Sequence, residues 1–66
     1  MSDIKHPDVT VTLVGEDGNA FAILGKVSKA LKRAGYGDEV DQYMAEAMAG
    51  DYNELLATTM RWVDVQ

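Results

Sequence analysis

The segment from Asn19 to Ala34 constrains the fold most, because its apolar residues recur at the spacing of an α-helix. Leu24, Val27 and Leu31 lie three or four residues apart and therefore share one helical face. The basic residues of the segment fall on the opposite side; they are Lys26, Lys29, Lys32 and Arg33. This pattern predicts a helix whose apolar side packs on the rest of the chain and whose basic side faces water.

The residues that flank this segment predict where the helix begins and ends. Asp17-Gly18-Asn19 is typical of a turn followed by a capping side chain. Gly35 is expected to end the helix, because glycine adopts the left-handed conformation without a Cβ clash. Gly25 is discordant, since glycine costs about 1 kcal/mol relative to alanine inside a helix. It either permits a close backbone approach or is tolerated on the outer face.

Two further helices are predicted over residues 38–49 and 51–60, because apolar residues recur there at helical spacing. Asp51 followed by Glu54 is a variant of the capping box and predicts a helix start. The expected apolar faces are Val40, Tyr43, Met44, Ala47 and Met48 in the first of these helices, and Tyr52, Leu55, Leu56, Thr59 and Met60 in the second.

The two ends of the chain alternate with a period of two, which is typical of strands. Strands are predicted over residues 8–14 and 61–66, and they are expected to pair because a lone strand leaves its backbone unsatisfied. The predicted fold class is therefore α+β, in the order β-α-α-α-β, with a two-stranded sheet packed against three helices. Three chain reversals favour parallel strands, but a skewed third helix would make them antiparallel. The inward residues are expected to be Val9, Val11, Leu13, Val63 and Val65.

Length and composition limit the class of protein. Sixty-six residues with 47% hydrophobic content indicate one small globular domain, which we place at residues 8–66. Residues 1–7 are polar, end in His6-Pro7 and are expected to form a flexible tail. Cysteine is absent from the sequence, which excludes disulfides and thiolate metal sites. The first residues lack an apolar signal core and no apolar run approaches a membrane span of about 20 residues, so we expect a cytoplasmic protein without membrane association.

No catalytic, cofactor-binding or metal-binding residue is expected. His6 is the only histidine and stands in the predicted tail. Gly25-Lys26 superficially resembles a phosphate-binding loop, but Val27 occupies the position where serine or threonine would bind magnesium. Asp38 and its acidic neighbours lie in a first helical turn, where they compensate the helix dipole. The sequence therefore favours a protein that is not an enzyme.

Two surfaces are candidates for binding. Lys26, Lys29, Lys32 and Arg33 have the spacing to contact phosphates from one helix face. The net charge of −5 argues against a general nucleic-acid binder. A solvated outer face is the default explanation of these cations, and pairing with the chain's own acids is a further one. The second surface is the sheet face opposite the helices, where Trp62 is expected to be exposed unless it folds over the sheet edge or packs on the tail. This possible partner surface comprises Thr10, Thr12, Val14, Trp62 and Asp64.

The run from Leu13 to Val27, with Gly50–Leu56 and Trp62-Val63 further on, resembles a group of small uncharacterised bacterial and prophage-type proteins. The resemblance implies a phage-related protein and carries over no activity, cofactor or residue role. The main hypothesis is a small cytoplasmic protein-interaction or regulatory module, which would form a homodimer if the sheet pairs with a second copy. The alternative is a nucleic-acid accessory protein that binds through the basic face of the first helix.

Overall fold

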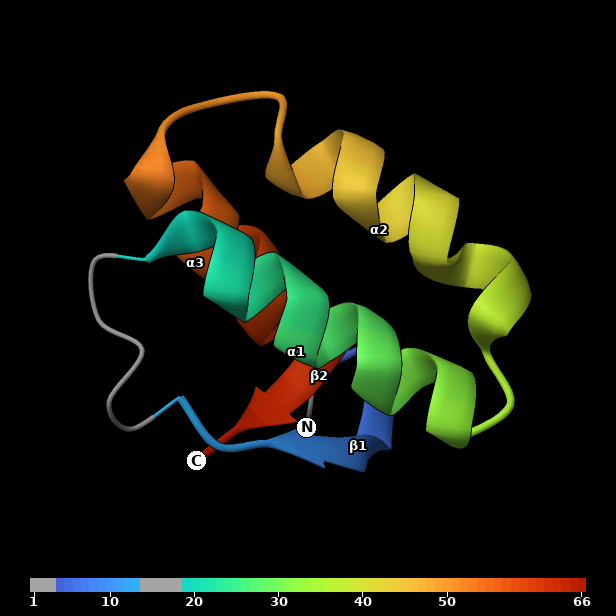
Figure 1. The fold of residues 1–66 in the computed structure, drawn as a ribbon. Coiled ribbons are helices and arrows are strands. Elements are labelled where there is room, and N and C mark those ends of the chain that lie inside the picture. The colour runs from blue at the N-terminus through green and yellow to red at the C-terminus, as the bar shows by residue number, and fades with distance from the viewer. Residues whose placement is uncertain (1–3, 14–18) are drawn as a thin grey trace.

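The structure, a computed structural model, describes residues 4–13 and 19–66 and consists of a two-stranded sheet with three α-helices on one side of it (Figure 1). This arrangement confirms the predicted α+β fold and its β-α-α-α-β order. The elements along the chain are β1 (His6–Val11), α1 (Ala20–Arg33), a short 3-10 helix η1 (Gly37–Glu39), α2 (Val40–Ala47), α3 (Tyr52–Trp62) and β2 (Val63–Val65).

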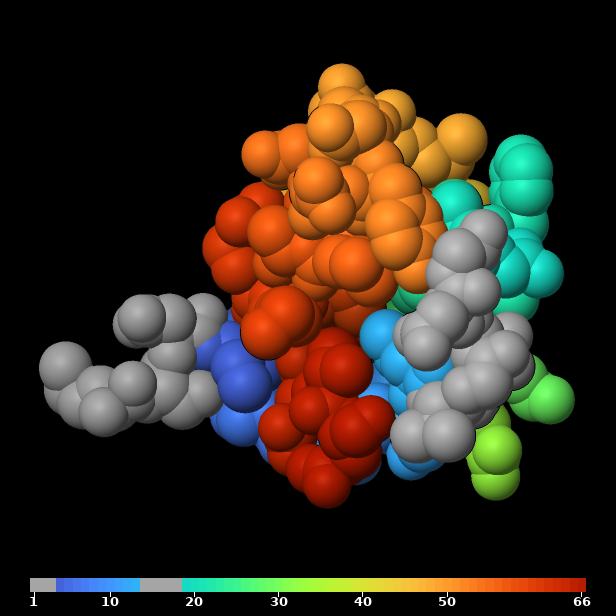
Figure 2. Space-filling view, turned by 90° about the vertical axis from the view of Figure 1, so that its left-hand side faces the viewer, coloured from blue at the N-terminus to red at the C-terminus, as the bar shows by residue number. Residues whose placement is uncertain are grey.

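The sheet joins the two ends of the described chain, and its strands are parallel. His6 lies opposite Val63 and Val11 opposite Val65, with an irregularity in the pairing between His6 and Thr10. In Figure 2 the C-terminal residues (red) lie below α3 (orange), with residues of the N-terminal region (blue) on both sides. Parallel pairing is the alternative that the sequence pattern favoured over antiparallel pairing.

The core lies between the sheet and the three helices, and α1 is at its centre. Val27 and Leu31 are fully buried, so the apolar face predicted for the first helix is confirmed. The inward residues of the sheet meet this face, because Val9, Val11 and Val63 are buried and belong to the same cluster. The remaining buried apolar members are Ile23, Leu24, Tyr43, Ala47, Leu55 and Trp62.

The ends of α1 are set by the residues that the sequence indicated. The Asn19 side-chain oxygen accepts a hydrogen bond from the backbone N–H of Ala22 at 3.0 Å. Gly35 adopts φ +93°, the left-handed conformation that ends a helix. The Tyr36 N–H then donates to the carbonyl of Leu31 at 2.8 Å. A Cβ at Gly25 would meet no atom within 4 Å, so Gly25 is tolerated on the outer face and permits no close contact.

The predicted boundaries of the other helices need correction. A 3-10 turn precedes α2, and α3 continues two residues beyond its predicted end to Trp62. It does so because Leu55, Thr58 and Trp62 recur at helical spacing on its buried face. Met48 and Met60, which we placed on apolar faces, are 56% and 62% exposed.

The predicted N-terminal tail also needs correction, because β1 begins at His6 and the His6 residue is only 8% exposed. The backbone N–H of Lys5 donates to the carbonyl of Arg61 at 2.8 Å and extends the pairing further. Pro7 has no N–H to contribute to a ladder, but it lies within the irregular part of the pairing, where proline is tolerated. Val14, predicted as the last strand residue, lies outside the described residues. In the two described ranges, no helix is both long and apolar enough to cross a membrane.

Candidate binding groove between β1 and α1

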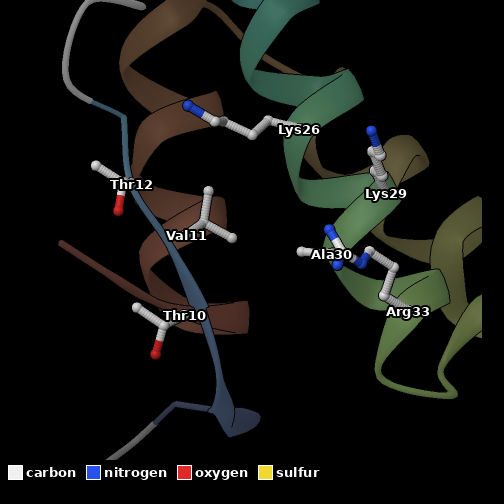
Figure 3. A pocket seen from close by; sticks show the side chains of 7 residues that line it. All are labelled: Thr10, Val11, Thr12, Lys26, Lys29, Ala30 and Arg33. Atoms are coloured by element: carbon white, nitrogen blue, oxygen red, sulfur yellow. The ribbon is translucent and has the colours of Figure 1, made fainter.

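A groove of about 320 Å³ runs between β1 and one flank of α1 (Figure 3). It brings together residues from both of the candidate surfaces that the sequence indicated. Its lining residues are Thr10, Val11 and Thr12 on the strand side, and Lys26, Lys29, Ala30 and Arg33 on the helix side.

The strand wall of the groove presents backbone rather than hydroxyl groups. Figure 3 shows the Val11 side chain pointing toward α1 and the Thr10 and Thr12 side chains pointing away from it. The Val11 carbonyl accepts from the Gln66 N–H at 2.9 Å, and the Leu13 N–H donates to the Gln66 carbonyl at 3.5 Å. Successive residues of a strand direct their backbone groups to opposite edges. The N–H and C=O groups of Thr10 and Thr12 therefore face the outer edge of β1.

The helix wall carries three cations on one flank. Lys26, Lys29 and Arg33 are spaced by three and four residues, so their side chains share this flank of α1. Lys29 and Arg33 are exposed and form no ion pair with any residue that the structure describes. Lys26 lies toward the Thr12 end of the groove and Arg33 toward the Thr10 end, so α1 and β1 run in opposite directions (Figure 3). The small Ala30 side chain leaves room between them.

Lys32, the fourth predicted phosphate-contacting residue, does not line this groove. It is exposed and lies beside Gly37, where an added Cβ would come within 3.6 Å of its Cγ. The four cations of the predicted basic face are therefore divided: three line the groove and Lys32 lies apart.

The groove continues toward the start of β1 as a hollow of about 300 Å³. Arg33, Thr10 and Ala30 line both parts, and Asp8 lines only the continuation. The Asp8 carboxylate accepts a hydrogen bond from the Tyr36 hydroxyl at 3.0 Å. This hydrogen bond raises the pKa of Tyr36 above its ordinary value. A carboxylate therefore marks the end of the otherwise cationic groove.

Trp62, predicted as an exposed member of the partner surface, is only 3% exposed and does not belong to that surface. Trp62 is the last residue of α3 and lies in the core, with its ring centroid 5.6 Å from that of Tyr43. Its indole N–H donates to Glu46 at 3.0 Å, and the Lys5 ammonium lies 4.1 Å from the ring centroid. The side chain thus stabilises the fold. Of the other predicted members, Thr10 and Thr12 are exposed, Asp64 is half-buried and Val14 is not described.

A second hollow, of about 240 Å³, is apolar and lies between the start of α1 and the α2–α3 connection. Phe21 and Met48 flank it and are 81% and 56% exposed, while Leu24, Ala47 and Leu55 form its floor. Helical spacing placed Met48 on an apolar face of its helix, so the sequence pattern did not indicate this hollow.

A polar cluster at the start of β1 was also missed by the sequence reasoning. His6 stacks on Tyr36 with ring centroids 3.9 Å apart, and its Nε2 lies 3.0 Å from a carboxylate oxygen of Glu39. The Lys5 ammonium lies 3.5 Å from the same oxygen. The hydrogen bond with His6, followed by the charge of His6 and the contact with Lys5, lowers the pKa of Glu39. No local pattern predicts this cluster, because its members lie far apart in the sequence.

The lowered pKa of Glu39 gives a prediction about acid stability. A carboxyl whose pKa is lower in the folded than in the unfolded protein stabilises the fold above its unfolded pKa of about 4.5. That stabilisation is lost as the pH falls through the lower folded pKa. Urea unfolding over a pH series is expected to show a shallower acid-side decline for Glu39→Gln than for wild type. If the free energy of unfolding depended on pH identically in the two proteins, a role for Glu39 would be contradicted. The variant is still expected to lose some stability in acid, because hydrogen bonds to Trp62 and Gln42 also lower the pKa of Glu46.

The described residues include no group of three or more histidine, cysteine or acidic side chains placed to hold a metal ion. The groove instead combines cations with a strand edge, which suits anionic groups and extended chains. Comparison with protein-family models, with curated proteins and with solved structures gave no match. The resemblance to prophage-type proteins stays a prediction.

Proposed function

We propose that this protein is a small cytoplasmic protein-interaction module that holds an acidic partner protein in the groove between β1 and α1. The observation that carries the proposal is the convergence of Lys26, Lys29 and Arg33 with the outer edge of β1. The whole chain has a net charge of −5, so three cations on one groove wall form a local site of opposite sign. The cysteine-free composition is compatible with the cytoplasm.

Nucleic-acid binding is the second candidate function, because the same three cations could contact phosphates. Two features make it the weaker one. The net charge of −5 repels an extended polyanion over the rest of the surface. In addition, none of the described residues that line the groove is aromatic, so these residues offer bases nothing to stack on. An acidic protein segment needs only the local cations.

A binding role also fits the groove better than a catalytic one. The seven lining residues include no histidine, cysteine or carboxylate that could activate a nucleophile, and the Thr10 and Thr12 hydroxyls point away from α1. A homodimer through the open sheet face would have to form without Trp62, which lies in the core. We therefore place the partner in the groove rather than on the open sheet face.

Fluorescence anisotropy with labelled acidic peptides and a labelled oligonucleotide tests this function. Wild type is expected to bind glutamate-rich peptides with an affinity that falls as salt is added. The double variant Lys29→Glu/Arg33→Glu is expected to lose about tenfold or more in affinity, because it reverses two exposed contacts worth up to about 1 kcal/mol each.

Lys32→Glu is the matched control, because it reverses an exposed cation of the same helix that does not line the groove. It is expected to bind nearly as tightly as wild type. The control changes the net charge half as much as the double variant, so a loss of binding free energy about half as large would show that net charge, and not the groove, determines binding. Tighter binding of the oligonucleotide than of every peptide would favour the nucleic-acid function, and no binding of any acidic peptide would overturn the proposal.

A further inference from the structure

We infer, building on the function proposed above, that the partner segment binds as an extended strand which adds to the outer edge of β1 and carries acidic residues at alternate positions. The inference names both the conformation of the partner and the pattern of its side chains. It depends on three observations: the edge of β1, the position of α1 beside it, and the charge of the groove's helix wall.

The outer edge of β1 is suited to strand addition. The sheet of the described residues contains only β1 and β2, so no further strand of that part of the chain pairs with β1. Thr10 and Thr12 line the groove, and their backbone groups face this outer edge because those of Val11 and Leu13 pair with Gln66. An edge strand with such groups pairs readily with an extended chain, whose main-chain hydrogen bonds supply affinity. Pro7 limits pairing only at the beginning of the strand.

The helix α1 determines which side chains of the added strand would meet the cations. Because α1 covers one face of the sheet, alternate side chains of a strand beside β1 would point toward its basic flank. Lys26 and Arg33 are seven residues apart, which corresponds to about 10 Å along a helix. Alternate residues of a strand lie about 7 Å apart, and three of them span about 13 Å. Two or three acidic residues at every second position therefore match the length of the basic flank.

The intervening side chains of the added strand would lie on the open sheet face with those of Thr10 and Thr12. Threonine or another β-branched residue suits these positions, because cross-strand pairs of this kind stabilise a sheet. A second copy of this chain fits less well. Its strands each contain one acidic residue, Asp8 in β1 and Asp64 in β2, so neither presents acids at alternate positions.

The test uses a short peptide in which glutamate and threonine alternate, added to the full-length protein. Amide hydrogen exchange followed by NMR is expected to slow by about tenfold or more at Thr10 and Thr12 when the peptide saturates the protein, because their N–H groups gain partners. The N–H of Leu13 already donates to Gln66, so its exchange is expected to change much less.

The peptide backbone provides an independent measurement. Only every second N–H of an added strand points toward β1. Methylation of the peptide nitrogens that point toward β1 is therefore expected to weaken binding by about tenfold or more. Methylation of the nitrogens in between, the other phase of the alternation, is expected to leave binding nearly unchanged. A peptide of the same composition with its glutamates consecutive controls for charge alone.

The outcomes separate the inference from the proposed function. Slowed exchange at Thr10 and Thr12 together with phase-dependent methylation would support strand addition. Binding that requires Lys29 and Arg33, but leaves the exchange of Thr10 and Thr12 unchanged, would overturn strand addition and leave the proposed function standing. Equal effects of methylation in both phases would also overturn strand addition. Absence of binding by every acidic peptide would overturn both.

Discussion

Replacing Trp62 with alanine is expected to destabilise the protein by about 3–5 kcal/mol, the usual cost of removing a large buried aromatic side chain. Trp62 is 3% exposed, packs edge-on against the Tyr43 ring, and donates from its indole N–H to Glu46. Its removal would leave a cavity between α2, α3 and the start of β1. Small domains have stabilities near the low end of about 5–15 kcal/mol, so a loss of this size would leave much of the population unfolded.

Thermal and urea unfolding followed by far-UV circular dichroism measures this effect, since the variant has no tryptophan fluorescence. Met60→Ala is the matched control, because Met60 lies on the same helix and is 62% exposed. It is expected to change the free energy of unfolding by no more than about 0.5 kcal/mol. A Trp62→Ala protein as stable as the Met60→Ala protein would contradict the core position of Trp62.

Replacing Thr59 with valine is expected to cost about 1–3 kcal/mol, more than replacing its partner Tyr43 with phenylalanine. The Thr59 hydroxyl donates to the Leu55 carbonyl at 2.9 Å. It has one hydrogen, so the Tyr43 hydroxyl, 2.7 Å away, must donate to Thr59. Both residues are fully buried. Thr59→Val therefore leaves the Tyr43 O–H in an apolar environment without an acceptor, whereas Tyr43→Phe leaves Thr59 still bonded to Leu55.

A double-mutant cycle tests this assignment. The Thr59→Val/Tyr43→Phe protein is expected to be more stable than Thr59→Val alone, because no unsatisfied Tyr43 hydroxyl remains. Free energies of unfolding from urea titrations at one pH provide the comparison. Costs that add, with the double variant less stable than either single variant, would show that the two hydroxyls do not depend on each other.

The helical part of the fold could be predicted from the sequence because its signals are local. The apolar spacing of Leu24, Val27 and Leu31, the cap at Asn19 and the stop at Gly35 all lie within or beside the helix that they define. Trp62 was misplaced because two periods overlap at that point. It completes the helical row that includes Leu55, but it also begins the alternating run that continues through Val63. Only tertiary packing decides between the two.

The candidate groove could be predicted only in its parts. The cations Lys26, Lys29 and Arg33 and the exposed Thr10 and Thr12 were identified, but on separate surfaces. Their convergence depends on which edge of β1 faces away from β2 and on the side of the sheet that α1 covers, and no local pattern contains that information. The contact of His6 with Glu39 was missed because the two residues are 33 positions apart in the sequence. The place of Glu39 near a helix start also offered a sufficient explanation of its charge.

The pairing of β1 with β2 has a consequence for the synthesis of the protein. β2 follows the three helices in the chain and is synthesised after β1, so the sheet cannot close before Val65 has been added. Contacts between such distant residues slow folding, because a long loop must be ordered before they form. The helices can pack together earlier through short-range contacts, and the pairing of β1 with β2 would then complete the domain in a later step.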